Sequence, residues 1–118
     1  MYFILFTFIL TFVQAKYVFT EKDYESMQII PSNEIIRIEL KTNPSTGYSW
    51  KLRELDPDHF VLVEHGIQPP ERIQPGSSYT EFWDIETLDK GFTFIYLFYN
   101  SNNCGPIDHD YIIAFQII

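Results

Sequence analysis

The residues that could carry out catalysis in this 118-residue chain do not fall into a known catalytic arrangement. The histidines His59, His65 and His109 are scattered, and no two have the i, i+4 spacing with which a helix presents two imidazoles to a metal ion. Ser77, His109 and Asp110 could be drawn as a nucleophilic triad, but Ser77 lies outside any G-x-S-x-G turn. We therefore predict a protein that is not an enzyme and that uses neither metal nor cofactor.

The segment of residues 43–50 is instead typical of a rigid turn that binds a partner. Pro44 fixes its own φ, and the side chain of Asn43 can hydrogen-bond to the backbone that follows it. Gly47 can adopt a positive φ without steric cost. A turn that is ordered before binding loses little entropy on binding, so this segment suits insertion into a cleft.

The side chains around this turn divide into an anchor and a tip. Tyr48 and Trp50 are two residues apart, so they fall on one face of the next strand and are expected to anchor the loop in the core. Ser45 and Thr46 are small and polar, and we expect them to project as a narrow wedge. The alternative is that the segment only connects two strands.

The rest of the chain has the patterns of an all-β protein. Phe, Tyr, Ile and Trp dominate its apolar residues, and no stretch of twelve residues has a clear helical period. Seven or so short strands separated by turns predict an antiparallel β-sandwich. The run 92–99 is apolar on both faces, which predicts a central strand. The expected strands are 16–20, 34–41, 49–53, 60–63, 79–86, 92–99 and 111–118.

Residues 43–48 resemble the N-P-T-T-G-Y/F loop of the chagasin family, whose members inhibit papain-like cysteine peptidases. Only Ser45 differs, where threonine is usual. Further features follow in the family's order from about Tyr17 to the C-terminus: Trp50, a Phe-x-Val strand at 60–63, Pro69-Pro70, Thr80-Glu81, Gly91, Tyr99 and Gly105-Pro106. The resemblance implies an immunoglobulin-like sandwich of eight strands, which agrees with the strand count above.

The resemblance also implies a peptidase-binding site made of three loops at one end of the sandwich. The corresponding residues are Asn43, Pro44, Ser45, Thr46, Gly47 and Tyr48; Gly76, Ser77 and Ser78; and Ser101, Asn102 and Asn103. The second loop keeps one glycine of the family's G-x-G-G motif, and the third lacks the R-P-W/F motif. The loss of an arginine and an aromatic residue removes two residue types that often dominate binding energy.

The implied function is reversible inhibition of papain-like cysteine peptidases. The first loop would fill the cleft around the catalytic cysteine and histidine, with Thr46 near the thiolate. The alternative function is that of a secreted immunoglobulin-like adhesion or receptor-binding module, in which the same loop is only a turn.

Charge and cysteine content limit the partners further. The chain carries 8 basic and 16 acidic residues, a net charge of −8, which disfavours nucleic-acid binding. Its single cysteine, Cys104, cannot form an internal disulfide. We predict a monomer with a partly exposed thiol that could link two chains.

Residues 1–15 are typical of a secretory signal peptide. The run 2–13 is apolar and too short to span a membrane, and Val13-Gln14-Ala15 offers small residues for cleavage. The alternative is an uncleaved anchor. We predict a mature domain of residues 16–118 that is secreted or enters lysosome-like or phagosomal vesicles.

Overall fold

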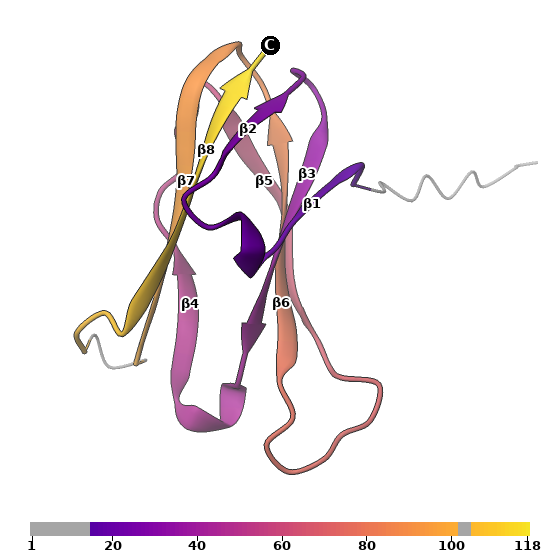
Figure 1. The fold of residues 1–118 in the computed structure, drawn as a ribbon, viewed down its shortest axis with the longest axis vertical. Helices are drawn as coiled ribbons and strands as arrows, with labels where there is room; N and C mark the ends of the chain where they lie inside the picture. The colour runs from indigo at the N-terminus through magenta and orange to yellow at the C-terminus, as the bar shows by residue number, and fades with distance from the viewer. Residues whose placement is uncertain (1–14, 102–104) are drawn as a thin grey trace, which may run out of the picture.

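The computed structural model describes residues 15–101 and 105–118, which form two facing four-stranded sheets (Figure 1). The first sheet has the order β1 (Tyr17–Phe19), β3 (Ile35–Thr42), β6 (Tyr79–Thr87), β5 (Phe60–Gln68). The second has the order β2 (Met27–Ile30), β8 (His109–Ile117), β7 (Gly91–Ser101), β4 (Tyr48–Leu52). The predicted immunoglobulin-like β-sandwich is therefore confirmed.

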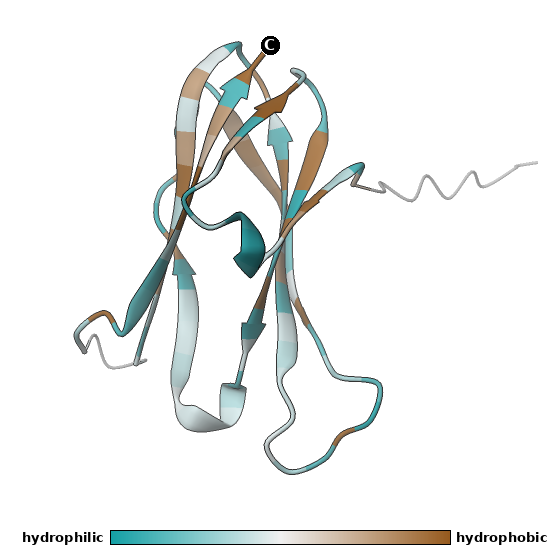
Figure 2. Ribbon diagram, in the orientation of Figure 1, coloured by the Kyte–Doolittle hydropathy of each residue, from teal (hydrophilic) through white to brown (hydrophobic). Residues whose placement is uncertain are grey.

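The core consists of alternate residues from the strands of both sheets. Along β3, Ile36, Ile38 and Leu40 are buried while the residues between them are partly exposed, as the period of a strand requires. The ring of Phe115 on β8 packs edge-on against Phe19 and Phe60 of the other sheet, at centroid distances of 5.5 and 5.6 Å. Hydrophobic and hydrophilic residues alternate along most strands, as Figure 2 shows.

Two strand pairs run parallel, which differs from the purely antiparallel sandwich predicted from the sequence. β1 pairs with β3 and β2 pairs with β8 in parallel register. The chain passes from one sheet to the other between β1 and β2 through the 3₁₀ turn η1 (Glu21–Asp23). Thr20 caps this turn, because its N–H donates to Asp23 Oδ2 at 2.9 Å and its side chain accepts from the N–H of Lys22.

The strand β2 was not predicted because it has little sequence signal. It has four residues, and only Ile30 among them is buried. Its place in the sheet depends on its pairing with β8, where Ile30 lies opposite Ile117. The structure's helical turns, η1 and η2 (Pro44–Thr46), have three residues each. Within the described residues, no helix is long and apolar enough to cross a membrane.

The position of β7 agrees with the prediction of a central strand, but its burial does not. It lies between β8 and β4, and Ile95 and Leu97 face the core. Phe92 and Phe94 point outward and are 68% and 56% exposed. The apolar pattern on both faces of this strand therefore does not reflect burial on both faces within this chain.

Candidate functional site

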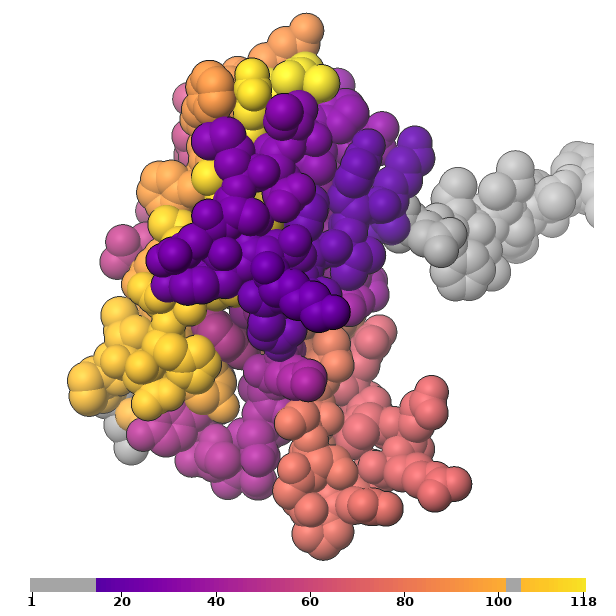
Figure 3. All heavy atoms as spheres, viewed as in Figure 1, coloured from indigo at the N-terminus to yellow at the C-terminus, as the bar shows by residue number. Residues whose placement is uncertain are grey.

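The first two predicted loop segments and Ser101, where the third begins, lie at one end of the sandwich, opposite the C-terminus (Figure 1). The first, 43–47, joins β3 to β4, and the second, 69–78, joins β5 to β6. The third connects β7 to β8. The space-filling view in Figure 3 shows the first and second segments next to each other at the lower end of the molecule. The fold thus brings distant parts of the sequence together on one surface.

The first loop is a 3₁₀ turn fixed at both ends. Asn43 caps its start: the side-chain oxygen accepts the N–H of Ser45 at 3.3 Å. Pro44 stands at the first position of the turn, where a missing N–H has no cost. Gly47 ends it in the left-handed conformation, with φ of 77°. The conformations predicted for Asn43, Pro44 and Gly47 in the turn are confirmed, while their contact with a peptidase stays a prediction.

The two hydroxyl groups at the tip bond to the turn itself. Ser45 Oγ donates to Asn43 Oδ1 at 2.7 Å, and Thr46 Oγ1 donates to the Asn43 carbonyl at 2.8 Å. The backbone N–H of Thr46 donates to the same carbonyl at 3.2 Å. Both residues are exposed, as predicted, but their hydroxyl groups serve first to hold the turn together.

Of the two predicted anchors, one is buried and the other is not. Trp50 is only 8% exposed, and its indole N–H donates to the carbonyl of Lys41 at 3.0 Å, across the base of the loop. Tyr48 is 38% exposed and stacks on Tyr99, with ring centroids 5.6 Å apart. The prediction that Tyr48 anchors the loop in the core is wrong, because Tyr48 is the first residue of β4 and packs on Tyr99 at the partly exposed end of the sheet.

An aromatic cluster joins the first loop to the third. Trp50, Tyr99 and His109 contact one another with ring centroids 4.8 to 5.1 Å apart. The N–H of Asp108 donates to the Tyr99 carbonyl at 2.8 Å, and Asn100 Nδ2 donates to the carbonyl of Gly105 at 3.2 Å. This cluster was not predicted as part of the site, and only the pairing of three separate strands brings its rings together.

The second loop contains a tight turn and an exposed apolar residue. The N–H of Ser77 donates to the carbonyl of Gln74 at 3.0 Å, and Ser77 Oγ accepts the N–H of Gln74 at 3.2 Å. Gly76, in this turn, has φ of 83°, and Ser78 is exposed. Ile73 is 73% exposed, more than any other large apolar side chain of the described residues.

The first two loops enclose an open groove of about 520 Å³. Its walls combine the polar turn of the first loop with the apolar side chains of the second. Among the lining residues are Pro44, Ser45, Ile73, Pro75 and Ser77. Ile73 was missed by sequence reasoning, although an isolated isoleucine among prolines and polar residues was a visible signal.

The third loop is described only in part. Ser101 is the last residue of β7 and pairs with Tyr48 of β4. Asn102, Asn103 and Cys104 lie outside the described residues. After them, Ile107 is exposed at the same end of the molecule. The predicted site thus includes one residue of β7 as well as loop residues.

The residues that could be drawn as a triad have separate partners. Ser77 bonds within its own turn, and His109 Nδ1 lies 2.7 Å from Asp108 Oδ2. Asp110 accepts the hydroxyl groups of Tyr24 and Tyr96. Ser77, His109 and Asp110 therefore do not form the hydrogen-bonded chain of nucleophile, base and orienting acid that a catalytic triad requires.

A buried carboxyl group lies below the loops on β6. Glu81 Oε2 is 2.5 Å from His65 Nε2, and the imidazole stacks on the indole of Trp83 at 5.1 Å. Burial raises the pKa of Glu81, and the hydrogen bond with His65 opposes that shift. Glu81 Oε1 is buried without a hydrogen bond of good geometry from the described residues, and the nearby backbone of Trp50 also lowers the pKa of Glu81. Within residues 15–101 and 105–118, no group of three His, Cys, Asp or Glu side chains could hold a metal ion.

Comparisons with known proteins agree with this geometry. Residues 29–116 match the sequence model of one protein family, which is described as "Chagasin family peptidase inhibitor I42". A relative is Amoebiasin-2 of Entamoeba histolytica, 41% identical over 54 residues, which are 46% of this chain and 43% of the relative. The alignment thus spans less than half the length of that relative.

Two solved structures share the fold. The crystal structure of the cysteine protease inhibitor EhICP2 from Entamoeba histolytica is 28% identical, with a TM-score of 0.72 over 86% of this chain and 94% of that one. The solution structure of Amebosin is 21% identical, with a TM-score of 0.69 over 86% and 97% of the two chains. The family match covers most of the sequence and almost the whole sandwich, and this chain belongs to the chagasin family of peptidase inhibitors.

Proposed function

We propose that this protein is a reversible inhibitor of papain-like cysteine peptidases and that it occludes their catalytic cleft with residues 43–48. The observation that carries the proposal is the self-bonded turn at the end of the sandwich, flanked by two further loops. Family membership supports the class of activity. The similar protein EhICP2 is itself described as a cysteine protease inhibitor.

The turn explains how the inhibitor could enter the cleft without large entropic cost. Hydrogen bonds from Ser45 and Thr46 to Asn43 and the left-handed Gly47 hold one conformation in the free protein. Few rotations therefore remain to be frozen on binding. The small side chains of Ser45 and Thr46 leave room for the backbone to approach the catalytic cysteine, with Thr46 near the thiolate.

The same hydrogen bonds explain why the turn would not be cleaved. A peptidase must bring a carbonyl carbon into attack geometry at its nucleophile. The Asn43 carbonyl already accepts two hydrogen bonds from Thr46, and residues 44–46 form a 3₁₀ turn. We infer that no carbonyl of the tip aligns with the nucleophile, so that binding is reversible.

The flanking loops would hold the walls of the cleft. Ile73 and Pro75 of the second loop present apolar surface beside the tip, and Ser101 pairs with Tyr48 at the end of the first loop. A standard interface of this kind buries about 1,600 Å² in total. No observation favours an adhesion module over this function.

We further propose that the mature protein begins at Lys16 and acts in the secretory pathway or in vesicles. Cleavage after Ala15 would leave the eight strands of the described residues intact, because β1 starts at Tyr17. The functional test is a titration of papain with the purified protein at constant substrate. We expect residual activity to fall to zero near one inhibitor chain per enzyme and to return on dilution. Unchanged activity at high excess of inhibitor would refute the proposed function.

A further inference from the structure

The two sheets of the sandwich have very different outer faces. On the first sheet, the guanidinium of Arg37 forms two hydrogen bonds with the carboxylate of Asp84, at 2.7 and 2.9 Å, and lies 4.3 Å from the ring centroid of Phe82. The apolar ring on that face is therefore covered by a charged side chain. Val18, Val61 and Ile67 of the same sheet are exposed at 48%, 44% and 49%, less than Phe92 and Phe94 of the other sheet.

The second sheet has an uncovered apolar area on its outer side, which we call the aromatic face. Phe94 lies opposite Ala114, which lies opposite Met27, and Phe92, Gln116 and Ile29 form the next row. Directly opposed residues of neighbouring strands are about 5 Å apart, so the rows form one continuous surface. Its apolar residues are Met27, Ile29, Phe92, Phe94, Ile112 and Ala114, and the polar Gln116 lies between Phe92 and Ile29. Those on β2 and β7 are all exposed.

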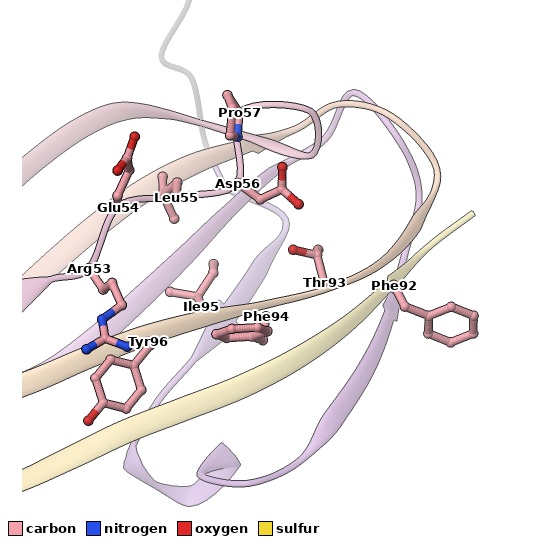
Figure 4. A pocket seen from close by; sticks show the side chains of 10 residues that line it. All are labelled: Arg53, Glu54, Leu55, Asp56, Pro57, Phe92, Thr93, Phe94, Ile95 and Tyr96. Carbon is pink, nitrogen blue, oxygen red and sulfur yellow. The ribbon is translucent and has the colours of Figure 1, made fainter.

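A groove continues the aromatic face over the edge of β7. It has a volume of about 370 Å³ and lies between β7 and the segment 53–57 (Figure 4). In this view Leu55 and Ile95 point into the groove, while the ring of Phe92 projects away from the body of the protein. β4 pairs with β7 only from Leu97 onward, which leaves the groove open beside Phe94. A projecting ring and an apolar groove thus lie next to each other.

The side chains of the aromatic face do not themselves add to the charge repulsion between two copies. The chain carries a net charge of −8, so most approaches of two copies are repulsive. None of the six side chains of the aromatic face is charged. Arg53 lies at its margin, 4.8 Å from the ring centroid of Tyr96, and Glu54 follows it beside the groove. Two copies related by a twofold axis could thus place apolar surfaces together and set Arg53 near Glu54 of the other copy.

The size of the aromatic face is compatible with such a dimer. Phe92, Phe94, Met27 and Ile29 are each more than half exposed, and with their neighbours they offer on the order of 500 Å² per copy. The groove residues bring this area toward the ~800 Å² per partner of a standard interface. Contiguous apolar patches of this size on a monomer commonly mark interaction sites.

We propose that the aromatic face binds a second copy of this chain in an isologous dimer, with Phe92 of each copy lying in the groove of the other. Twofold symmetry requires a surface that complements itself, and a projecting ring next to a groove meets that requirement. β7 runs from the turn before Gly91 toward the loop end, so Phe92 lies far from the three loops. The dimer would leave both sets of loops free.

The test is sedimentation equilibrium of the mature protein, residues 16–118, over a hundredfold range of concentration. Reductant is present so that a Cys104 disulfide cannot contribute. We expect a mass that rises from one chain to two. Phe94→Ser and Phe92→Ser should each weaken dimerisation by tenfold or more. Val61→Ser, at an exposed apolar position on the other sheet, is the matched control and should leave dimerisation unchanged.

Two results would overturn the proposal: a single-chain mass at every concentration, or a dimer that both phenylalanine variants leave intact. Circular dichroism of each variant shows whether it is folded. Papain titration of the same samples separates this proposal from the proposed function. A dimer that does not inhibit refutes only the function, and a monomer that inhibits refutes only the dimer.

Discussion

The indole N–H of Trp50 donates a hydrogen bond to the backbone carbonyl of Lys41 at 3.0 Å. The two residues lie on β4 and β3, which belong to different sheets. The bond therefore closes the base of the 43–47 loop and fixes the separation of the two strands that carry it. The ring of Trp50 also contacts Tyr99 and His109, so the same side chain links the first and third loops.

Replacing Trp50 by phenylalanine should affect inhibition as well as stability. The variant keeps an aromatic ring but leaves the Lys41 carbonyl without its donor, which should lower the free energy of unfolding by about 1–3 kcal/mol. We expect papain inhibition to weaken by about tenfold, because the loop base loosens. Urea unfolding and inhibition constants measure the two effects.

Phe60→Leu is a suitable control for that experiment. Phe60 is buried against Phe115 at the end of the sandwich far from the loops. The smaller side chain should destabilise the protein by about 1–2 kcal/mol and leave inhibition unchanged. Equal losses of inhibition in the two variants would mean that stability alone is responsible.

Gly47 and Gly76 allow the contributions of two loops to be compared directly. Both have positive φ, 77° and 83°, and a Cβ added at either would meet no atom within 4 Å. Valine at either position therefore adds backbone strain of about 1–2 kcal/mol without a steric clash. We expect Gly47→Val to weaken papain inhibition by about a hundredfold, or 2.7 kcal/mol, because the tip must change shape.

The matched variant Gly76→Val should weaken inhibition by less than about tenfold, since a peripheral loop contributes less than the central one. Inhibition constants are to be measured on both variants after circular dichroism has shown that they are folded. A larger loss for Gly76→Val would assign the principal contact to the second loop.

Ile73 is expected to contribute to binding beyond what the family motif indicates. Its side chain is 73% exposed beside the tip, where its replacement costs little stability. An apolar side chain that fills a pocket of a partner commonly contributes 2 kcal/mol or more. We predict that Ile73→Ser weakens papain inhibition by about tenfold or more, whereas Val61→Ser, remote from the loops, leaves it unchanged. Inhibition by Ile73→Ser at the level of the unmodified protein would exclude a binding role.

The sequence predicts most of the strands because their pattern is local. β3 alternates strictly between buried and partly exposed residues, so Ile36, Ile38 and Leu40 identify it without reference to any other segment. β2 could not be predicted in this way, because only Ile30 is buried and its partner is eighty-seven residues away at Ile117. β1 pairs in parallel with β3, and β2 pairs in parallel with β8 of the other sheet. Both pairings depend on a crossover between the sheets that no local pattern indicates.

The candidate site was predictable where backbone chemistry decides the structure. Asn43, Pro44 and Gly47 determine a turn through their own conformational preferences. The exposure of Tyr48 and the contact of Trp50 with His109 depend on where two sheets end in space, and residue types alone do not contain that information. The outer face of β7 was predicted to be buried, and the structure shows it exposed. The sequence could not distinguish the two, because a buried face and an exposed apolar face are made of the same residue types.

The pH dependence of stability should report on Glu81. Burial raises the pKa of this carboxyl group in the folded protein above its value in the unfolded chain. The folded state then holds a proton that the unfolded state has lost, so the contribution of Glu81 to stability is present below the usual glutamate pKa and declines as pH rises through the raised pKa. Unfolding by urea at a series of pH values, starting near 4 and rising to 7, should show that decline.

Glu81→Gln should remove this decline of stability with rising pH. Glutamine is a neutral side chain of the same shape that can still hydrogen-bond to His65. The variant is expected to be more stable than the unmodified protein at pH 7, and to have a flatter pH profile. Glu86→Gln on the same strand removes one negative charge from a partly exposed position and serves as the control for net charge. If Glu81→Gln and Glu86→Gln changed the profile equally, overall charge rather than burial would determine the pH dependence. If Glu81→Gln destabilised the protein at pH 7, the ionised carboxylate with His65 would be a favourable pair, and the burial penalty at Glu81 would be smaller than the structure indicates.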